Sequence, residues 1–166
     1  MRFLANFYQS ISAILDLFAG DMGYCLRYNF YKFSGIKLGK SVKIFKNVMI
    51  NQPYNLELGD YCSIGIGCII SAMKKIKIGR GTNLSPYCCI YDHDHVMPLK
   101  KREEFIINPV EIGSGCWVGA HSVILKGVKI GNNVTIGAGS IVTKNIPDNS
   151  IAFGVPAKVR GKNNLK

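Results

Sequence analysis

The sequence lacks several features that mark particular classes of protein. It has six prolines in 166 residues, one tryptophan and three histidines, and its six cysteines never occur in a Cys-x-x-Cys spacing. Because structural zinc sites use such paired cysteines, we do not expect one here. Low proline together with 48% hydrophobic residues argues against disorder. The 18 glycines therefore belong to the turns of a single ordered domain.

Acidic residues are also scarce. Lys and Arg outnumber Asp and Glu by 21 to 10, which gives a formal net charge of +11. This excess either makes a solvated basic surface or attracts a polyanion, such as the phosphates of CoA, an anionic lipid surface or a charged glycan. The basic residues are spread singly, and no RRM, KH or helix-turn-helix signature occurs, so nucleic acid is not an expected partner.

The chain has no long uninterrupted hydrophobic run. Its apolar stretch from Phe3 to Ala19 contains Asn6, Gln9, Ser10 and Asp16, which argues against a signal peptide and against a membrane span. We therefore expect a cytoplasmic protein with reduced cysteines, with a peripheral location at the inner membrane as an alternative.

The N-terminal region follows helical spacing. The apolar positions of a first helix are Leu4, Phe7, Ile11, Ile14, Leu15 and Phe18, and Gly20 is suited to end it. Asp21 is suited to cap a second helix that runs through Phe33 and ends near Gly35. We expect residues 1–35 to cover the open end of the structure that follows, as the ends of a solenoid require. Alternatively, the basic and aromatic stretch from Arg27 to Lys32 rests on a membrane surface.

A six-residue repeat runs through most of the chain. Its anchors are aliphatic, are often followed by glycine, and fall into five groups of three: Leu38, Ile44 and Ile50; Leu58, Ile64 and Ile70; Ile78, Leu84 and Ile90; Ile112, Val118 and Ile124; Ile130, Ile136 and Val142. A period of six would rotate the anchors around an α-helix, so short strands are expected instead.

The spacing between these groups indicates a three-sided coil. Steps within a group are six residues, whereas steps between groups are eight, eight, twenty-two and six. Each insertion therefore follows a third anchor, so it adds residues at one corner and leaves three flat faces in register. We predict an all-β solenoid, a parallel β-helix of about five coils over residues 36–143, with a loop protruding at 91–109 and a C-terminal extension at 144–166.

The position two residues before each anchor should also point inward, because strand side chains alternate with a period of two. These positions carry small or apolar residues: Val42, Val48, Leu56, Cys62, Cys68, Ile76, Thr82, Cys88, Val110, Cys116, Ser122, Val128, Val134 and Ser140. Four of the six cysteines are among them, and we interpret those four as core residues rather than a redox site.

The loop at 91–109 contains the candidate catalytic groups. It opens with Tyr91-Asp92-His93-Asp94-His95. Long loops on a rigid scaffold often carry function. An imidazole can remove a hydroxyl proton near neutral pH, and a neighbouring carboxylate can fix its tautomer. Either histidine is therefore a candidate general base, with Asp92 or Asp94 to orient it.

A zinc site is the alternative interpretation of these histidines, since one β-helix family with this repeat consists of metal-dependent carbonic anhydrases. Such a site needs three imidazoles. The chain has only His93, His95 and His121, and the last belongs to the next coil. We therefore expect no bound metal, and we interpret His121 as structural.

Four features together resemble the hexapeptide-repeat acyltransferases, in particular the sugar and polysaccharide O-acetyltransferases. They are the hexapeptide series, the Asp-His-Asp-His loop, the segment Trp117-Val118-Gly119 and the ending Gly154-Val155-Pro156-Ala157. The resemblance covers about residues 30 to 160. It implies a left-handed coil, which the repeat alone does not specify, and a homotrimer with each active site between two neighbouring β-helices.

The resemblance also implies roles for particular residues. The family's catalytic histidine corresponds to His95 when Ser85-Pro86 is matched without gaps, with His93 as the alternative. Contacts to acetyl-CoA would come from Ala120, Ala138, Thr143 and Lys144, with Lys158 and Arg160 near the nucleotide phosphates, and the outward-pointing Trp117 would stack on the pantetheine arm, on a sugar face or on another subunit. Gly65 and Met73 replace the asparagine and aspartate that bind the acceptor sugar in galactoside-type enzymes, so simple galactosides are not expected substrates.

We therefore predict an acetyl-CoA-dependent O-acetyltransferase that modifies a carbohydrate acceptor, a bacterial surface glycan or its precursor, by direct transfer. The histidine would remove the hydroxyl proton as the oxygen attacks the thioester, and the backbone N–H of Ala120 would stabilise the oxyanion. The alternative within this class is an N-acetyltransferase of a nucleotide-linked amino sugar. A metal-dependent hydratase of the γ-carbonic anhydrase type and a non-catalytic β-helix subunit are alternatives from other classes.

Overall fold

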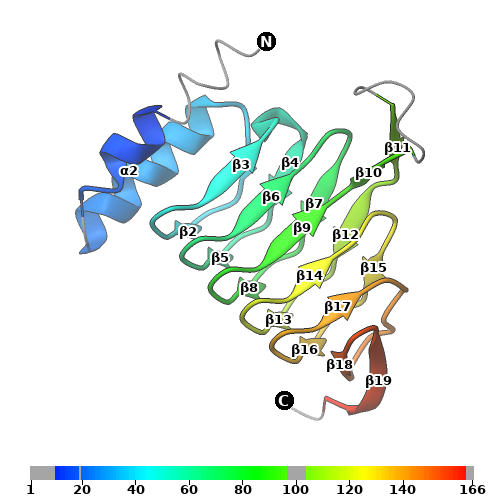
Figure 1. The fold of residues 1–166 in the computed structure, drawn as a ribbon. Coiled ribbons are helices and arrows are strands. Elements are labelled where there is room, and N and C mark those ends of the chain that lie inside the picture. The colour runs from blue at the N-terminus through cyan, green and yellow to red at the C-terminus, as the bar shows by residue number, and fades with distance from the viewer. Residues whose placement is uncertain (1–9, 19, 97–103, 164–166) are drawn as a thin grey trace.

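The computed structural model describes residues 10–18, 20–96 and 104–163. They form a left-handed parallel β-helix of five coils, in which each short strand stacks on its counterpart in the next coil (Figure 1). Every predicted anchor lies in a strand, so the period, the three-sided coil and the number of coils are confirmed.

The strands form three faces, named here A, B and C. Face A holds β1 (Lys37–Leu38), β4 (Leu56–Leu58), β7 (Ile76–Ile78), β12 (Val110–Ile112) and β15 (Lys129–Ile130). Face B holds β2 (Lys43–Ile44), β5 (Ser63–Ile64), β8 (Asn83–Leu84), β13 (Trp117–Val118), β16 (Thr135–Ile136), β18 (Ser150–Gly154) and β19 (Ala157–Lys162). Face C holds β3 (Met49–Asn51), β6 (Ile69–Ser71), β9 (Cys89–Tyr91), β14 (Val123–Ile124) and β17 (Ile141–Val142). The corner after face B is called the BC corner, and the corner after face C the CA corner, where the 3-10 helix η1 (Pro53–Asn55) also lies.

The interior of the coils is filled as the alternation predicts. All the expected inward positions are buried, including Cys62, Cys68, Cys88 and Cys116. The hydroxyls of Thr82 and Ser122 donate to carbonyls of the next coil, as Thr82 Oγ1 does to Gly113 O at 2.7 Å, and Ser140 donates to Gly137 O of its own coil. Burial raises the pKa of the Cys62 and Cys116 thiols. These cysteines are therefore neutral core residues, as expected.

The outward sides of faces A and C differ in chemistry. Face A carries an alternating ladder of charges on consecutive coils: Lys37, Glu57, Lys77, Glu111 and Lys129. The Lys37 ammonium lies 3.0 Å from the Glu57 carboxylate. Face C instead presents apolar side chains that are partly or fully exposed: Met49, Ile69, Cys89, Val123 and Ile141. Face A is thus suited to water and face C to contact with another surface.

The N-terminal end of the β-helix is covered by α2 (Gly20–Phe33) (Figure 1). The helix begins one residue before the expected cap, so Asp21 lies in its first turn, where a negative charge suits the helix dipole. Three of its side chains donate to carbonyls of the first coil: Arg27 Nε to Ile44 O at 2.8 Å, Tyr28 Oη to Gly39 O at 3.2 Å and Tyr31 Oη to Val48 O at 2.9 Å. These bonds satisfy backbone acceptors that would otherwise lack a next coil.

The segment before α2 is helical over residues 10–15, and the earlier part of the expected first helix lies outside the described residues. Within the described ranges, no helix has the length and apolarity needed to cross a membrane. At the other end, β18 continues face B in parallel with β16, and β19 pairs antiparallel with β18. Both ends of the solenoid are thus closed by elements outside the repeat.

Candidate active site

A two-stranded arm projects from the CA corner of the third coil (Figure 1). It consists of β10 (His93–His95) paired antiparallel with β11 (Phe105–Ile107), and residues 97–103 between them lie outside the described ones. At its base, Asn108 N donates to Asp92 O at 2.8 Å, and Gly127 N of the fourth coil donates to Asn108 O at 3.0 Å. The sequence predicted only a loop here, and the paired strands hold the two histidines on an ordered element.

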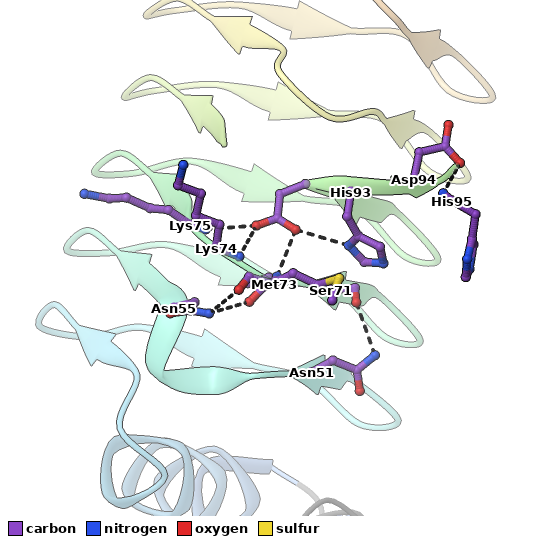
Figure 2. Close-up of polar contacts among 11 residues, drawn as sticks. Asn51, Asn55, Ser71, Met73, Lys74, Lys75, His93, Asp94 and His95 are labelled. Carbon is purple, nitrogen blue, oxygen red and sulfur yellow. Dashed lines mark hydrogen bonds and ion pairs between the residues drawn. The ribbon is translucent and has the colours of Figure 1, made fainter. Parts of the chain in front are cut away.

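The strand alternation of face C continues into the arm. Because Ile90 points into the coil, Tyr91, His93 and His95 fall on the outward side of the chain and the two aspartates on the other. Figure 2 shows both imidazole rings on one side of β10 and the Asp94 carboxylate on the opposite side. The alternation of Asp and His in this segment therefore places the carboxylates on one side of the chain and the imidazole rings on the other.

Asp92 is fully buried and anchors the base of the arm. Its carboxylate accepts from three consecutive backbone N–H groups, those of Met73 at 2.8 Å, Lys74 at 2.7 Å and Lys75 at 2.9 Å. It also lies 3.1 Å from His93 Nδ1. A carboxylate at this position holds the proton on Nδ1 and leaves Nε2 of the neutral ring as an acceptor. Asp92 thus orients His93.

His95 lies further out on the arm and is exposed. Its ring packs against Phe105, with centroids 4.7 Å apart. Its backbone N–H donates to Asp94 Oδ1 at 2.9 Å, and Asp94 Oδ2 lies 3.1 Å from Lys126 Nζ. The bond from Lys126, together with that from the His95 backbone, lowers the pKa of Asp94. Sequence reasoning missed Lys126, because nothing in the sequence signals that it lies across one coil from Asp94.

Of the two aspartates, Asp92 lies against a histidine ring, whereas Asp94 lies against Lys126. In the part of the chain that the structure describes, the contacts of Asp92 go to His93 and to backbone, and those of Asp94 go to Lys126 and to backbone. Asp94 interacts with His95 electrostatically, but a hydrogen bond from either carboxylate to the His95 ring is not among those of the described residues, and the assignment of an orienting carboxylate to His95 stays a prediction.

Two of the expected acetyl-CoA contacts, Ala120 and Ala138, occupy equivalent places at the BC corner of consecutive coils. The turns there place His121 (φ 59°) and Gly139 (φ 67°) in the left-handed region, and Gly139 N donates to Ala120 O at 2.8 Å. Among the described residues, the backbone N–H groups of Ala120 and Ala138 donate to no acceptor of this chain. Each is an available donor for a carbonyl or an oxyanion.

The aromatic groups beside this corner are Trp117 and His121. Trp117 points outward from face B, is 54% exposed, and donates from Nε1 to Ser85 Oγ at 2.8 Å. The His121 ring stacks on Tyr87 with centroids 5.0 Å apart, which agrees with a structural role. His121 thus lies at the BC corner and the arm histidines at the CA corner. Within the described chain, no three metal-binding side chains are grouped to hold an ion.

The remaining expected contacts lie near the C-terminus. Thr143 and Lys144 follow β17 at the CA corner, two coils beyond the arm, and Lys158 and Arg160 lie on β19. All four are exposed. One chain therefore places its candidate residues at opposite edges of face C, with His95, Thr143 and Lys144 at one edge and Ala120 and Ala138 at the other.

Comparison with known proteins agrees with this architecture. Residues 109–144 match the family described as bacterial transferase hexapeptide (six repeats). The chain is 32% identical over 154 residues to a protein named putative colanic acid biosynthesis acetyltransferase WcaF from Escherichia coli (strain K12), covering 90% of this chain and 82% of that protein.

Two solved structures extend the likeness to three dimensions. A maltose O-acetyltransferase from Clostridium difficile 630 has a TM-score of 0.84 and 30% identity, covering 97% of this chain and 87% of that one. A galactoside acetyltransferase in complex with coenzyme A has a TM-score of 0.73 and 26% identity, covering 96% of this chain and 82% of that one.

Proposed function

The chain belongs to the bacterial hexapeptide-repeat acetyltransferases, and on that basis we propose that it moves the acetyl group of acetyl-CoA to a hydroxyl of a bacterial surface glycan or its precursor. The relatives support this proposal, since one is named for colanic acid biosynthesis, one for maltose O-acetylation, and one was solved with coenzyme A. The observation that carries it is the placement of an exposed imidazole, His95, on an ordered arm at one edge of face C and of unpaired N–H donors at the other.

We further propose that the protein is a homotrimer that packs through face C. The apolar outward side of this face favours burial, whereas the charged ladder of face A favours water. Around a threefold axis, the BC corner of one copy would meet the CA corner of the next. This packing would bring Ala120 and Ala138 of one subunit to His95, Thr143 and Lys144 of its neighbour and complete the site.

In the proposed reaction, His95 removes the proton of the acceptor hydroxyl as the oxygen attacks the thioester carbonyl. The new C–O bond forms, the C–S bond breaks, and the proton passes from the imidazole to the departing thiolate. The backbone N–H of Ala120 or Ala138 stabilises the oxyanion as it develops. Lys144, Lys158 and Arg160 are suited to the CoA phosphates because they are exposed cations near the end of the solenoid.

The direct test is transfer itself. The protein is incubated with acetyl-CoA and a panel containing maltose, the methyl glycosides of glucose, galactose and fucose, and a nucleotide-linked amino sugar, and release of free thiol is followed. We expect thiol release that depends on a hydroxyl acceptor, with one acetyl ester found on the sugar by mass spectrometry. Transfer only to the amine would replace O-acetylation by N-acetylation, and a protein that neither binds nor cleaves acetyl-CoA would overturn the proposal.

The shared site has its own test, which uses two variants that are each inactive. His95→Ala removes the base from the CA corner, and Ala138→Trp blocks the BC corner. If the site lies between copies, co-expression of the two variants restores up to about one quarter of wild-type activity, since a random mixture pairs an intact BC corner with an intact CA corner at that frequency. If each site lies within one chain, the mixture stays inactive.

A further inference from the structure

The helix α2 has its polar and apolar sides in the reverse of the usual order. Polar side chains, among them Arg27 and Tyr31, face the first coil and donate to its carbonyls. On the other side of the helix lie Met22, Leu26 and Phe33, which are 60%, 37% and 87% exposed and are called the outer stripe here. A helix that covers a protein core normally turns its apolar side inward. Packing on its own β-helix therefore does not explain the outer stripe.

The outer stripe points along the axis of the β-helix, away from the coils. Met22 and Leu26 are each five positions before Arg27 and Tyr31, which on an α-helix is a rotation of about 140°. Because Arg27 and Tyr31 reach carbonyls of the first coil, the stripe lies on the far side of α2, at the end of the coil stack (Figure 1). Face C and its neighbouring corners are not involved.

The segment before α2 adds further exposed apolar side chains at the same end. It packs beside the helix, since Arg27 Nη1 donates to Leu15 O at 3.1 Å. Ile14 and Leu17 of this segment are 58% and 79% exposed. Large apolar side chains gathered on one part of a surface mark contact with a protein or with a membrane.

The same end of the molecule is strongly basic. Between residues 20 and 50 the only acidic residue is Asp21, against six lysines and arginines. The Arg27 guanidinium lies 3.8 Å from Asp16, and the Lys37 ammonium lies 3.0 Å from Glu57. The ion pairs of the described residues leave the other four cations of α2 and the first coil, which are Lys32, Lys40, Lys43 and Lys46.

These charges favour a lipid surface over a second copy of the chain. Two copies placed end to end through their outer stripes would bring like charges together, which opposes association. An anionic lipid surface instead suits both groups of side chains. The apolar ones enter the boundary between headgroups and acyl chains, and the lysines lie near the lipid phosphates.

The proposed trimer would present three outer stripes on one side. Packing through face C around a threefold axis keeps the three β-helices parallel, so all three N-terminal ends face the same direction. Contacts that engage one plane together bind far more tightly than each does alone. Three stripes therefore give stable attachment where a single short stripe would give only weak binding.

We propose that the outer stripe docks the protein on an anionic membrane surface, with Met22, Leu26 and Phe33 inserted and the lysines of α2 and the first coil against the lipid phosphates. The contact differs from the one expected from the sequence, because Arg27 and Tyr31 of the basic and aromatic stretch face the first coil. Docking is independent of acetyl transfer, and only its strength depends on the proposed trimer.

The test is sedimentation of the full chain with sucrose-loaded vesicles. We expect the wild-type protein to bind phosphatidylcholine vesicles that contain about 30% phosphatidylglycerol, and to bind pure phosphatidylcholine about tenfold less. Met22→Gln, Phe33→Gln should weaken binding to the anionic vesicles at least about tenfold. The matched control Tyr61→Gln, Val155→Gln replaces side chains that are 55% and 68% exposed and lie away from α2, and it should bind as the wild-type protein does.

The basic residues are tested with a pair of variants of equal charge. Lys32→Gln, Lys40→Gln should weaken binding to the anionic vesicles about tenfold and leave binding to pure phosphatidylcholine unchanged. Lys77→Gln, Lys129→Gln removes the same charge from the outward side of face A and should bind as the wild-type protein does. Equal losses in the two variants would assign binding to net charge alone and overturn the proposal.

Three other outcomes overturn the docking surface. They are a wild-type protein that does not bind the anionic vesicles, a Met22→Gln, Phe33→Gln variant that binds them fully, and an end-to-end association in sedimentation velocity that this variant abolishes, which would assign the stripe to a second copy. Thiol release with soluble sugars is measured on the same proteins and should be unchanged in the stripe variant. Failure of docking is thus distinguished from failure of the proposed function.

Discussion

Inside the coils and on the arm, side chains alternate in the same way, but the inward positions are filled differently. In the coils they hold aliphatic residues, cysteines and hydroxyls, and each hydroxyl donates to one backbone carbonyl, as Thr82 does to Gly113 of the next coil. On the arm the inward position holds Asp92, whose carboxylate gathers three backbone N–H groups and a histidine ring. The same alternation of side chains thus gives a repetitive core in the coils and a single buried polar group at the base of the arm.

This difference predicts which substitutions affect stability and which affect the reaction. A change inside a coil removes one contact among many similar ones and should affect stability alone. A change on the arm removes a contact that occurs once, and it should affect the reaction, the position of the arm, or both. The following predictions test that division, beginning with the largest expected effect.

Removing the proposed base should give the largest effect of all. His95→Ala should lower kcat by about 10²–10⁴-fold, because general base catalysis typically contributes that much, while the affinity for acetyl-CoA and the melting temperature stay nearly unchanged. His121→Ala is the matched control, since it removes a histidine that stacks on Tyr87 at a corner of the coils. Steady-state kinetics measures both variants. Near-wild-type turnover of His95→Ala would contradict the expectation that substitutions on the arm affect the reaction.

Asp92 should matter for stability more than any polar residue of the coil interior. Asp92→Ala leaves three partly buried N–H groups without their acceptor, so we expect a loss of about 2–4 kcal/mol in the free energy of unfolding, with lower activity as the arm loses its anchor. Thr82→Val removes the bond that Oγ1 donates to Gly113 O and the bond that it accepts from Cys116 N, and it should cost about 1–2 kcal/mol at full activity. Urea unfolding measures the loss of free energy of unfolding in both variants, and equal losses would contradict the prediction.

Two glycines of the BC corner differ in their surroundings: Gly119 is in close contact with backbone, whereas Gly139 borders open space. A Cβ on Gly119 would lie 2.5 Å from the backbone nitrogen of Ala138, whereas a Cβ on Gly139 would meet nothing within 4 Å. Gly119→Ala should therefore cost about 2–3 kcal/mol and weaken acetyl-CoA binding by displacing Ala138. Gly139→Ala should cost about 1 kcal/mol, from its positive φ alone. Thermal melting and acetyl-CoA titration measure the two effects. Equal melting temperatures and equal affinities for acetyl-CoA in the two variants would refute the prediction.

The ion pair between the arm and the fourth coil should give the smallest effect. Lys126→Met should raise the pKa of Asp94 toward its ordinary value, since the Lys126 bond is the main cause that lowers it. In the wild-type protein the folded-state pKa is depressed, so the contribution of this pair is present above the ordinary carboxyl pKa and is lost as pH falls through the lowered one. NMR titration of the Asp94 carboxyl in both proteins measures the change, and an unaltered pKa would contradict it.

Much of the coil stack could be predicted from the sequence, because its cause is local. Ile64 and its equivalents recur at six, and the inward cysteines follow from alternation. The arm could be located, since it follows the one large departure from the period, but its pairing and its contacts could not. Asp92 binds the turn at Met73, and Asp94 binds Lys126, through the stacking of coils. Such contacts depend on which coil lies beside the loop and at what register, which periodicity alone does not specify.

The helix α2 over the first coil prevents a second molecule from stacking on that end of the β-helix. A parallel β-helix grows in one dimension, and the carbonyls of Gly39, Ile44 and Val48 would form a template on which the last coil of another molecule could continue the sheets. Arg27, Tyr28 and Tyr31 occupy that template with side chains. Association along the axis at this end is thereby blocked, whereas the proposed threefold packing through face C would be sideways and would close on itself.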